Sequence, residues 1–99
     1  MDVEICSKLE IIEQILDSPT RVEYSVRCLS GTVEVGDLAV SGIDHDGSEV
    51  RLDLTVSTIL RYGRPCDLLD PPHHARLRLD GQSPGPNLIE RIFLSRSRD

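Results

Sequence analysis

The feature that most constrains the fold of this chain is an eight-residue alternation near its centre. In residues 50–57, Val-Arg-Leu-Asp-Leu-Thr-Val-Ser, aliphatic side chains alternate strictly with polar ones. Successive side chains of a β-strand point to opposite faces, so this period predicts a strand with one buried and one solvated face. Residues 22–28 and 75–80 show the same alternation. Periodicity alone therefore predicts three strands.

Turn residues divide the rest of the chain into short segments. Asp46-Gly47 lies between two apolar segments, as expected for a hairpin in which Gly accepts a positive φ. Gly or Pro also occurs at the other boundaries. Short strands broken in this way predict an all-β fold, a small closed Greek-key-like barrel of about six strands. The expected strands are residues 21–28, 32–35, 38–43, 49–56, 75–80 and 88–94.

The segment 9–16 supports two interpretations. Leu9, Ile12, Ile15 and Leu16 fit the apolar stripe of a helix, and the local pattern favours that element. A closed barrel instead needs a strand here, returning across residues 18–20 to pair with 21–28. We predict the strand.

Length and composition fit one small domain. The chain has 99 residues, of which 38% are hydrophobic, almost all of these Leu, Ile or Val. The aromatic residues are only Tyr24, Tyr62 and Phe93, which suits a compact barrel and not a platform that stacks nucleic-acid bases. We expect an N-terminal extension at 1–8, a single barrel domain at 9–94 and a frayed polar tail at 95–99.

Charge is unevenly distributed along the chain. The net charge is −6, but residues 1–50 carry three basic and eleven acidic side chains (−8), and residues 51–99 carry eight arginines and six acidic side chains (+2). We therefore expect an acidic half and an arginine-bearing half. The overall sign argues against DNA as a partner and against non-specific RNA binding, which rest on basic surfaces.

The cysteines and the N-terminus indicate a reduced, cytoplasmic protein. Cys6, Cys28 and Cys66 are odd in number and form no C-x-x-C pair. The start, Met-Asp-Val-Glu-Ile-Cys, resembles no signal peptide, and no apolar run approaches the ~20 residues that span a bilayer. We expect no membrane partner.

Residues 26–37, Val-Arg-Cys-Leu-Ser-Gly-Thr-Val-Glu-Val-Gly-Asp, resemble a signature of β-barrel domain II of elongation factor Tu and related translational GTPases. Tyr62-Gly63-Arg64 is similar to a turn of that domain, and residues 75–81 are similar to a strand with its closing Gly. The resemblance covers about residues 9–94 and implies a stand-alone domain II-like barrel. In that family the domain contacts ribosomal RNA and the aminoacyl end of transfer RNA.

The chain departs from that family in two ways. Pro71-Pro72-His73-His74 stands where the family has Pro-Gly or Ala-Gly before a strand. The sequence also contains no G-x-x-x-x-G-K-[ST] loop and no Asn-Lys-x-Asp motif, so we expect neither GTP binding nor hydrolysis.

The candidate catalytic and metal-ligating residues form no recognised pattern. Adjacent histidines such as His73 and His74 point in opposite directions on an extended segment, so they suit one ion poorly. Cys66 follows Pro65 in a turn and is the available nucleophile, whereas Cys28 falls on an apolar strand face and belongs to the core. We expect no cofactor, no metal and no enzymatic activity.

Four arginines form the best candidate binding surface: Arg61, Arg64, Arg76 and Arg78. Arg76 and Arg78 share the outward face of one strand and suit bidentate contact with carboxylates or phosphates. Pairing with an acid on a neighbouring strand, for instance Asp53, is the alternative role. These residues suggest a non-catalytic module that contacts a protein or a ribonucleoprotein. The second hypothesis is an acidic inhibitor or immunity-type protein that masks a basic enzyme.

Overall fold

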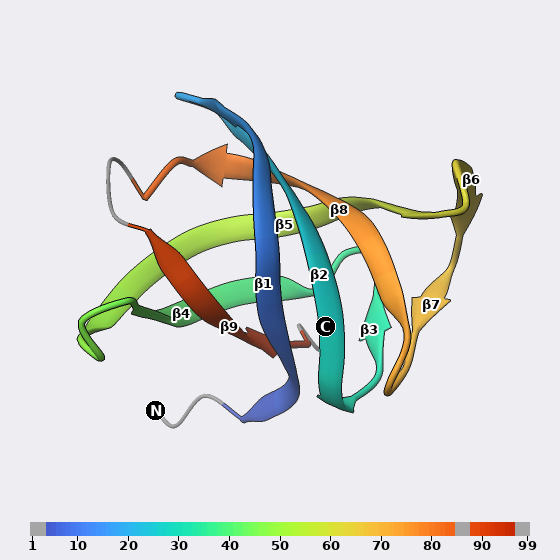
Figure 1. Ribbon diagram of the computed structural model, residues 1–99, viewed down its shortest axis with the longest axis horizontal. Coiled ribbons are helices and arrows are strands. Elements are labelled where there is room, and N and C mark those ends of the chain that lie inside the picture. Colours follow the sequence, from blue (N-terminus) through green and yellow to red (C-terminus); the bar gives the residue numbers. More distant parts are fainter. Residues whose placement is uncertain (1–3, 85–87, 97–99) are drawn as a thin grey trace.

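The computed structural model describes residues 4–84 and 88–96, all of whose regular elements are β-strands (Figure 1). Six long strands build one sheet, and three short segments accompany it. The strands are β1 (Ile5–Ser18), β2 (Arg21–Gly31), β3 (Val33–Glu34), β4 (Leu38–Asp44), β5 (Glu49–Arg61), β6 (Arg64–Cys66), β7 (Leu68–Leu69), β8 (His74–Gln82) and β9 (Ile89–Ser95).

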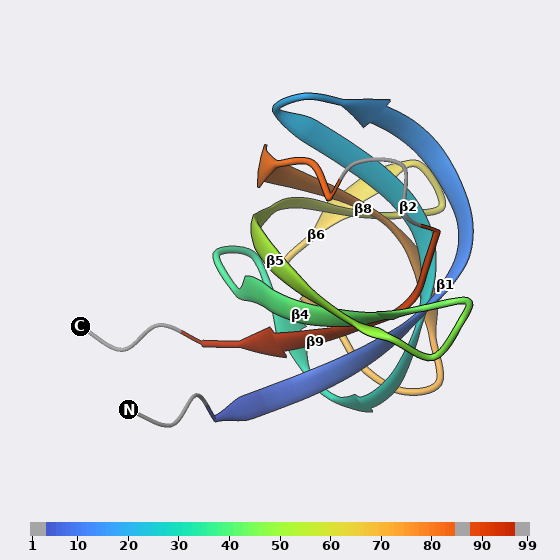
Figure 2. The same cartoon turned by 90° about the vertical axis from the view of Figure 1, so that its left-hand side faces the viewer.

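The sheet closes on itself. Neighbouring strands follow the order β4-β9-β1-β2-β8-β5, and an additional pairing of β4 with β5 joins the two edges of the sheet. All of these pairings are antiparallel, which gives a closed six-stranded barrel (Figure 2). The connections β2 to β4 and β8 to β9 join strands that are not neighbours, as in a Greek key. The predicted all-β barrel is confirmed.

The segment of ambiguous pattern is a strand. Residues 9–16 belong to β1, which returns as β2 in an antiparallel pair, as predicted. Its register with β2 shifts between Ile11 and Glu13 and again between Gln14 and Leu16, so Ile12 and Ile15 are extra residues in two bulges. Each bulge resets the two-residue alternation, which explains why the apolar positions have a helix-like spacing.

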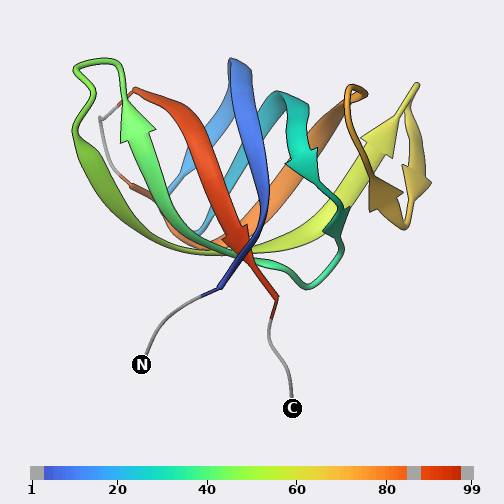
Figure 3. The ribbon, with the colours of Figure 1, turned by 90° about the horizontal axis from the view of Figure 1, so that it is seen from below.

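At both ends of the chain, the barrel strands continue beyond the expected domain bounds of residues 9 and 94. β1 begins at Ile5, so residues 5–8 form part of the sheet and not an extension. Ser95 still lies in β9, and its partner across the ladder is Ile5, so the first and last strands lie side by side (Figure 3). Arg96 is held by several contacts described below and is not frayed. Residues 1–3 and 97–99 lie outside the described residues.

The region between the expected strands 49–56 and 75–80 is more ordered than its sequence indicates. β5 continues to Arg61 and turns into β6. β7 pairs with β3, and Val33 and Leu69 from this small sheet are both fully buried in the core. A strand at the position of β3 was predicted at residues 32–35, whereas β6 and β7 were missed because two or three residues carry too little periodicity to be recognised.

The core is aliphatic and follows the alternation. Val22, Tyr24, Val26 and Cys28 of β2 all face inward. Burial, with a smaller contribution from the charge of Asp17, raises the pKa of Tyr24 to about 12. The prediction that Cys28 is a core residue is confirmed. Burial and the nearby charge of Asp70 raise the pKa of its thiol, an effect that a hydrogen bond to Ser30 partly offsets.

Two glycines allow strands to approach closely. Gly31 ends β2 at φ +72°, and a Cβ there would overlap the carbonyl oxygen of Cys6 in β1. Gly81, the last residue but one of β8, has φ +140°, and a Cβ there would overlap the carbonyl oxygen of Asp53 in β5. Both positions therefore require glycine for conformation and for space.

Substitution of these glycines tests that requirement. Gly31→Ala should lower the free energy of unfolding by about 3 kcal/mol or more, because the strain of a positive φ adds to the overlap of the new Cβ with the backbone. Gly36→Ala is the matched control: its φ is also positive (+98°) but its Cβ would meet no atom within 4 Å, so only about 1 kcal/mol is expected. Urea unfolding measures both, and equal losses would contradict the close-approach argument.

Candidate functional site

A groove of about 610 Å³ crosses the outer wall of the barrel. Its floor is a row of side chains that the strand registers place side by side on four neighbouring strands. Glu13 of β1 lies opposite Ser25 of β2, Ser25 opposite Arg76 of β8, and Arg76 opposite Leu60 of β5. The β5–β6 turn and the segment before β8 form one end of the groove. The site therefore combines residues from distant parts of the sequence.

Arg76 and Arg78 point outward from β8, as predicted, and both approach the same carboxylate. Arg78 Nη2 lies 3.5 Å from Glu23 Oε1, and Arg76 Nε lies 3.9 Å from the same oxygen. The suggested pairing with Asp53 is wrong, because Asp53 lies opposite Gln82 in the β5–β8 ladder. One carboxylate therefore faces two guanidinium groups, which leaves positive charge beside the groove.

Arg61 and Arg64 are cross-strand neighbours on either side of the β5–β6 turn. Arg61 lines the groove, and its guanidinium carbon lies 5.7 Å from the ring centroid of Tyr62. Its Nε is buried without a hydrogen-bond partner, and within the described residues no carboxylate forms an ion pair with it. Arg64 is exposed on β6 and does not line the groove. Only Arg61 and Arg76 of the four candidate arginines line it.

The two histidines lie at the same end of the groove but bond to different partners. His73 Nδ1 lies 3.0 Å from Asp70 Oδ1, across a turn in which the His73 amide donates to the Asp70 carbonyl. His74 Nε2 lies 2.9 Å from Arg27 Nη2. Within residues 4–84 and 88–96, no three His, Cys, Asp or Glu side chains gather in a way that could hold a metal ion.

Cys66 has a different hydrogen-bond partner from these histidines. It is half-buried against the core, and its thiol donates to the Leu68 carbonyl at 3.5 Å. In the described part of the chain no hydrogen bond links it to His73 or His74. The structure therefore does not assemble the nucleophile and base that the sequence offers.

The fold also mixes the acidic and basic halves of the sequence. Each described arginine–carboxylate pair joins a residue from 1–50 to one from 51–99, for example Arg21 with Asp80 at 2.8 Å. β8 lies next to β2, and β9 lies between β1 and β4, so strands from the two halves of the sequence are neighbours at several places, although β1 also pairs with β2 and β5 with β8. Several arginines of the C-terminal half therefore meet carboxylates of the N-terminal half, and the expected division into an acidic half and an arginine-bearing half stays a prediction.

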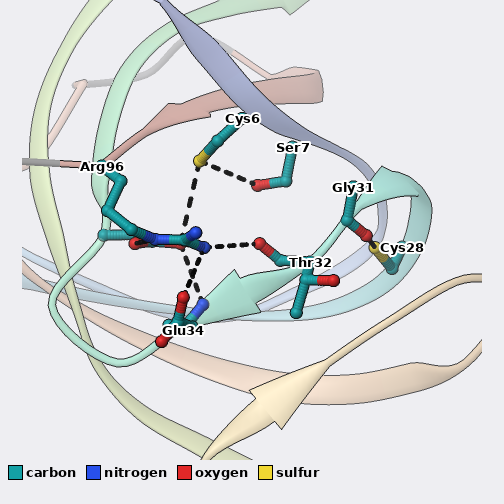
Figure 4. Close-up of polar contacts among 8 residues, drawn as sticks. Cys6, Ser7, Cys28, Gly31, Thr32, Glu34 and Arg96 are labelled. Atoms are coloured by element: carbon teal, nitrogen blue, oxygen red, sulfur yellow. Dashed lines mark hydrogen bonds and ion pairs between the residues drawn. The ribbon is translucent and has the colours of Figure 1, made fainter.

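A second polar cluster surrounds Asp37, whose side chain is almost fully buried. Figure 4 shows other members of this cluster, among them Arg96, Glu34, Thr32 and Cys6. Arg96 binds it in bidentate fashion, Nε to Oδ1 at 3.0 Å and Nη2 to Oδ2 at 3.2 Å. The Glu34 amide also donates to Oδ2, at 2.9 Å. Asp37 is the last residue of the Val-Gly-Asp motif, and the sequence offered no signal that Arg96 would be its partner.

Arg96 makes two further contacts within this cluster. Arg96 Nη2 donates to the Thr32 carbonyl at 2.8 Å and pairs with Glu34 at 2.9 Å. The hydrogen bond to Asp37 is the main cause that raises the pKa of Arg96. Since Asp37 and Arg96 satisfy each other, the cluster fastens the end of β9 to the β3–β4 turn, and we assign it a structural role.

Comparisons with models of known protein families, with curated proteins and with solved structures find no match for this chain. The resemblance to domain II of the translational GTPases therefore rests on the residues given above and stays a hypothesis. The described residues also include no helix with the length and hydrophobicity needed to cross a bilayer.

The Asp37–Arg96 pair can be tested by unfolding. Asp37→Ala should lower the free energy of unfolding by about 2–4 kcal/mol, because a buried carboxylate with three donors is lost. Arg96→Gln should lower the free energy of unfolding by about 1–2 kcal/mol, since Asp37 keeps only the Glu34 amide and the Cys6 thiol at 4.0 Å as donors. Arg91→Gln is the control, as Arg91 is exposed on the same strand and forms no ion pair within the described residues. Equal stability of the three variants would contradict the structural role.

Proposed function

We propose that this protein is a non-catalytic binding module that docks onto an acidic segment of a partner protein through the groove. The observation that supports this most directly is that Arg61 and Arg76 line one groove and neither has a carboxylate partner of its own within the described residues. Arg61 has no ion pair among the described residues, and Arg76 shares Glu23 with Arg78.

Guanidinium groups suit such a contact. Arg is planar, always charged and weakly hydrated, and it binds carboxylates through two parallel hydrogen bonds. The Nε of Arg61 is buried, so an incoming carboxylate would meet the terminal Nη groups of this guanidinium, which forms no ion pair among the described residues. A carboxylate-bearing partner would therefore bind Arg61 without breaking an internal ion pair.

We assign the side chains that line the groove to binding. Its histidines are bonded to Asp70 and Arg27, and no thiol lines it within the described residues. The proposal therefore assigns it recognition without a covalent step.

A ribonucleoprotein is the alternative partner for the same groove, supported by the resemblance to domain II. The net charge of −6 and the presence of Glu13 in the groove favour a protein. The resemblance to domain II is an argument about the fold and does not by itself imply an activity.

One observation favours a second function, an acidic inhibitor-type protein. β9 pairs with β1 only as far as Glu10, so the outer side of residues 11–18 has no partner strand in the described structure. Ile12, Ile15 and Leu16 are 38–51% exposed there, close to Glu13 and Asp17. An acidic surface with apolar residues would suit a basic partner.

Charge reversal in the groove tests the leading proposal. Arg61→Glu combined with Arg76→Glu should abolish capture of the partner from a lysate of the native organism, because a carboxylate would then meet negative charge. Arg51→Glu combined with Arg91→Glu makes the same charge change outside the groove and should leave that capture intact. Quantitative mass spectrometry of the captured proteins, with and without ribonuclease, measures the difference.

The outcomes separate the hypotheses. Proteins lost only from the groove variant, at unchanged levels after ribonuclease, support the proposal. Loss after ribonuclease would favour the ribonucleoprotein partner. Identical capture by the wild type and by both double variants would sink the groove as a binding site, and loss on Glu13→Arg with Asp17→Arg would then favour the inhibitor-type function.

A further inference from the structure

Tyr62 occupies a backbone position that its side chain does not suit. It is the only non-glycine residue with a positive φ (+53°) in the described chain, and it stands beside Gly63 at φ +75°. Arg61 and Arg64 pair directly across these two residues, so they form a two-residue hairpin loop. Positive φ at both central positions is the requirement of a type I′ turn, which favours Asn-Gly or Asp-Gly. An aromatic residue at the first position is unfavourable.

The fold gains little from this tyrosine in return. Its side chain is 95% exposed, the largest exposed fraction among the exposed large hydrophobic residues. Its one described ring contact is with Arg61, at 5.7 Å in solvent, where a cation–π interaction is weak. A strained residue that packs against nothing suggests a role outside folding.

The surroundings of Tyr62 indicate what it could contact. Tyr62 lines the groove together with Leu60, Pro72 and Arg61, so an apolar surface adjoins a guanidinium group. At the opposite end of the groove, Ile15 of β1 is 38% exposed next to Glu13. The groove therefore has apolar side chains at both ends and arginine between them.

We propose that Tyr62 is a recognition residue, and that the groove binds a short extended peptide segment with an acidic residue between two apolar ones. This inference rests on the proposed function. The acidic residue of the segment meets Arg61 and Arg76, one apolar side chain packs on the ring of Tyr62, and the other packs on Ile15. Glu13 excludes a second acidic residue at the β1 end.

The dimensions of the groove agree with this occupant. Its floor crosses four adjacent strands, and three inter-strand spacings span about 14 Å. A fully extended peptide covers that distance with about four residues. The apolar and acidic side chains of one short segment can therefore reach both ends at once.

Substitution by the residue that the turn prefers gives the sharpest test. Tyr62→Asn should keep or raise the thermal midpoint, because Asn accepts the left-handed conformation, and it should weaken peptide binding at least tenfold. Tyr62→Phe keeps the ring and should bind like the wild type. Leu68→Asn removes an apolar side chain of 50% exposure from β7, outside the groove, and should also bind normally.

The probe is an array of synthetic seven-residue peptides in which acidic and apolar positions are permuted, with a fluorescein-labelled oligouridylate as the nucleic-acid probe. The strongest peptide is then titrated by fluorescence anisotropy. Weaker binding by Tyr62→Asn at an undiminished thermal midpoint supports the inference, since unfolding cannot then explain the loss.

Other results overturn the inference at different levels. If Arg61→Glu with Arg76→Glu abolishes binding but Tyr62→Asn does not, the groove still binds and the role of Tyr62 is wrong. If wild-type protein prefers oligouridylate to every peptide, the proposed occupant is wrong. If no peptide binds, or if binding ignores the arginine variant, both the inference and the docking function through this groove fail.

Discussion

The position of β9 between β1 and β4 is the constraint on which the rest of the structure depends. Ile92 lies opposite Leu9 on one side and Gly42 on the other, so one strand joins the first and fourth strands of the chain. A Cβ at position 42 would come within 2.8 Å of the Arg91 carbonyl oxygen, so this approach needs glycine. Arg96, one residue after β9, then binds the buried Asp37 and fastens the closure.

The groove is a consequence of that closure. Because the sheet is closed with the order β1-β2-β8-β5 on one side, Glu13, Ser25, Arg76 and Leu60 form one row although 47 positions separate the first from the last. The same closure mixes acidic and basic parts of the sequence, so most carboxylates near arginines come from the other half of the chain. The positive charge near Arg61 and Arg76 is therefore a feature of the groove and not of one half of the sequence.

Two departures from local sequence rules lie at this groove. The bulge at Ile15 turns an apolar side chain outward at one end, and the left-handed Tyr62 holds an aromatic ring in solvent at the other. Elsewhere, positive φ angles fall on glycines, and the buried positions are largely aliphatic. Natural sequences are expected to break such rules where a site requires it.

The sequence by itself determined most of the barrel strands, because alternation and turn residues act over a few neighbouring positions, but its local pattern left residues 9–16 open between helix and strand. It indicated that Cys28 is buried, that Arg76 and Arg78 point outward, and that Asp46-Gly47 lies in a hairpin, all confirmed here. It did not determine the bulges of β1, the pairing of β7 with β3, the partner of Asp37, or the meeting of Arg61 with Arg76. Each of these depends on which strands become neighbours, and long-range pairing is decided only by closing the barrel and filling its core.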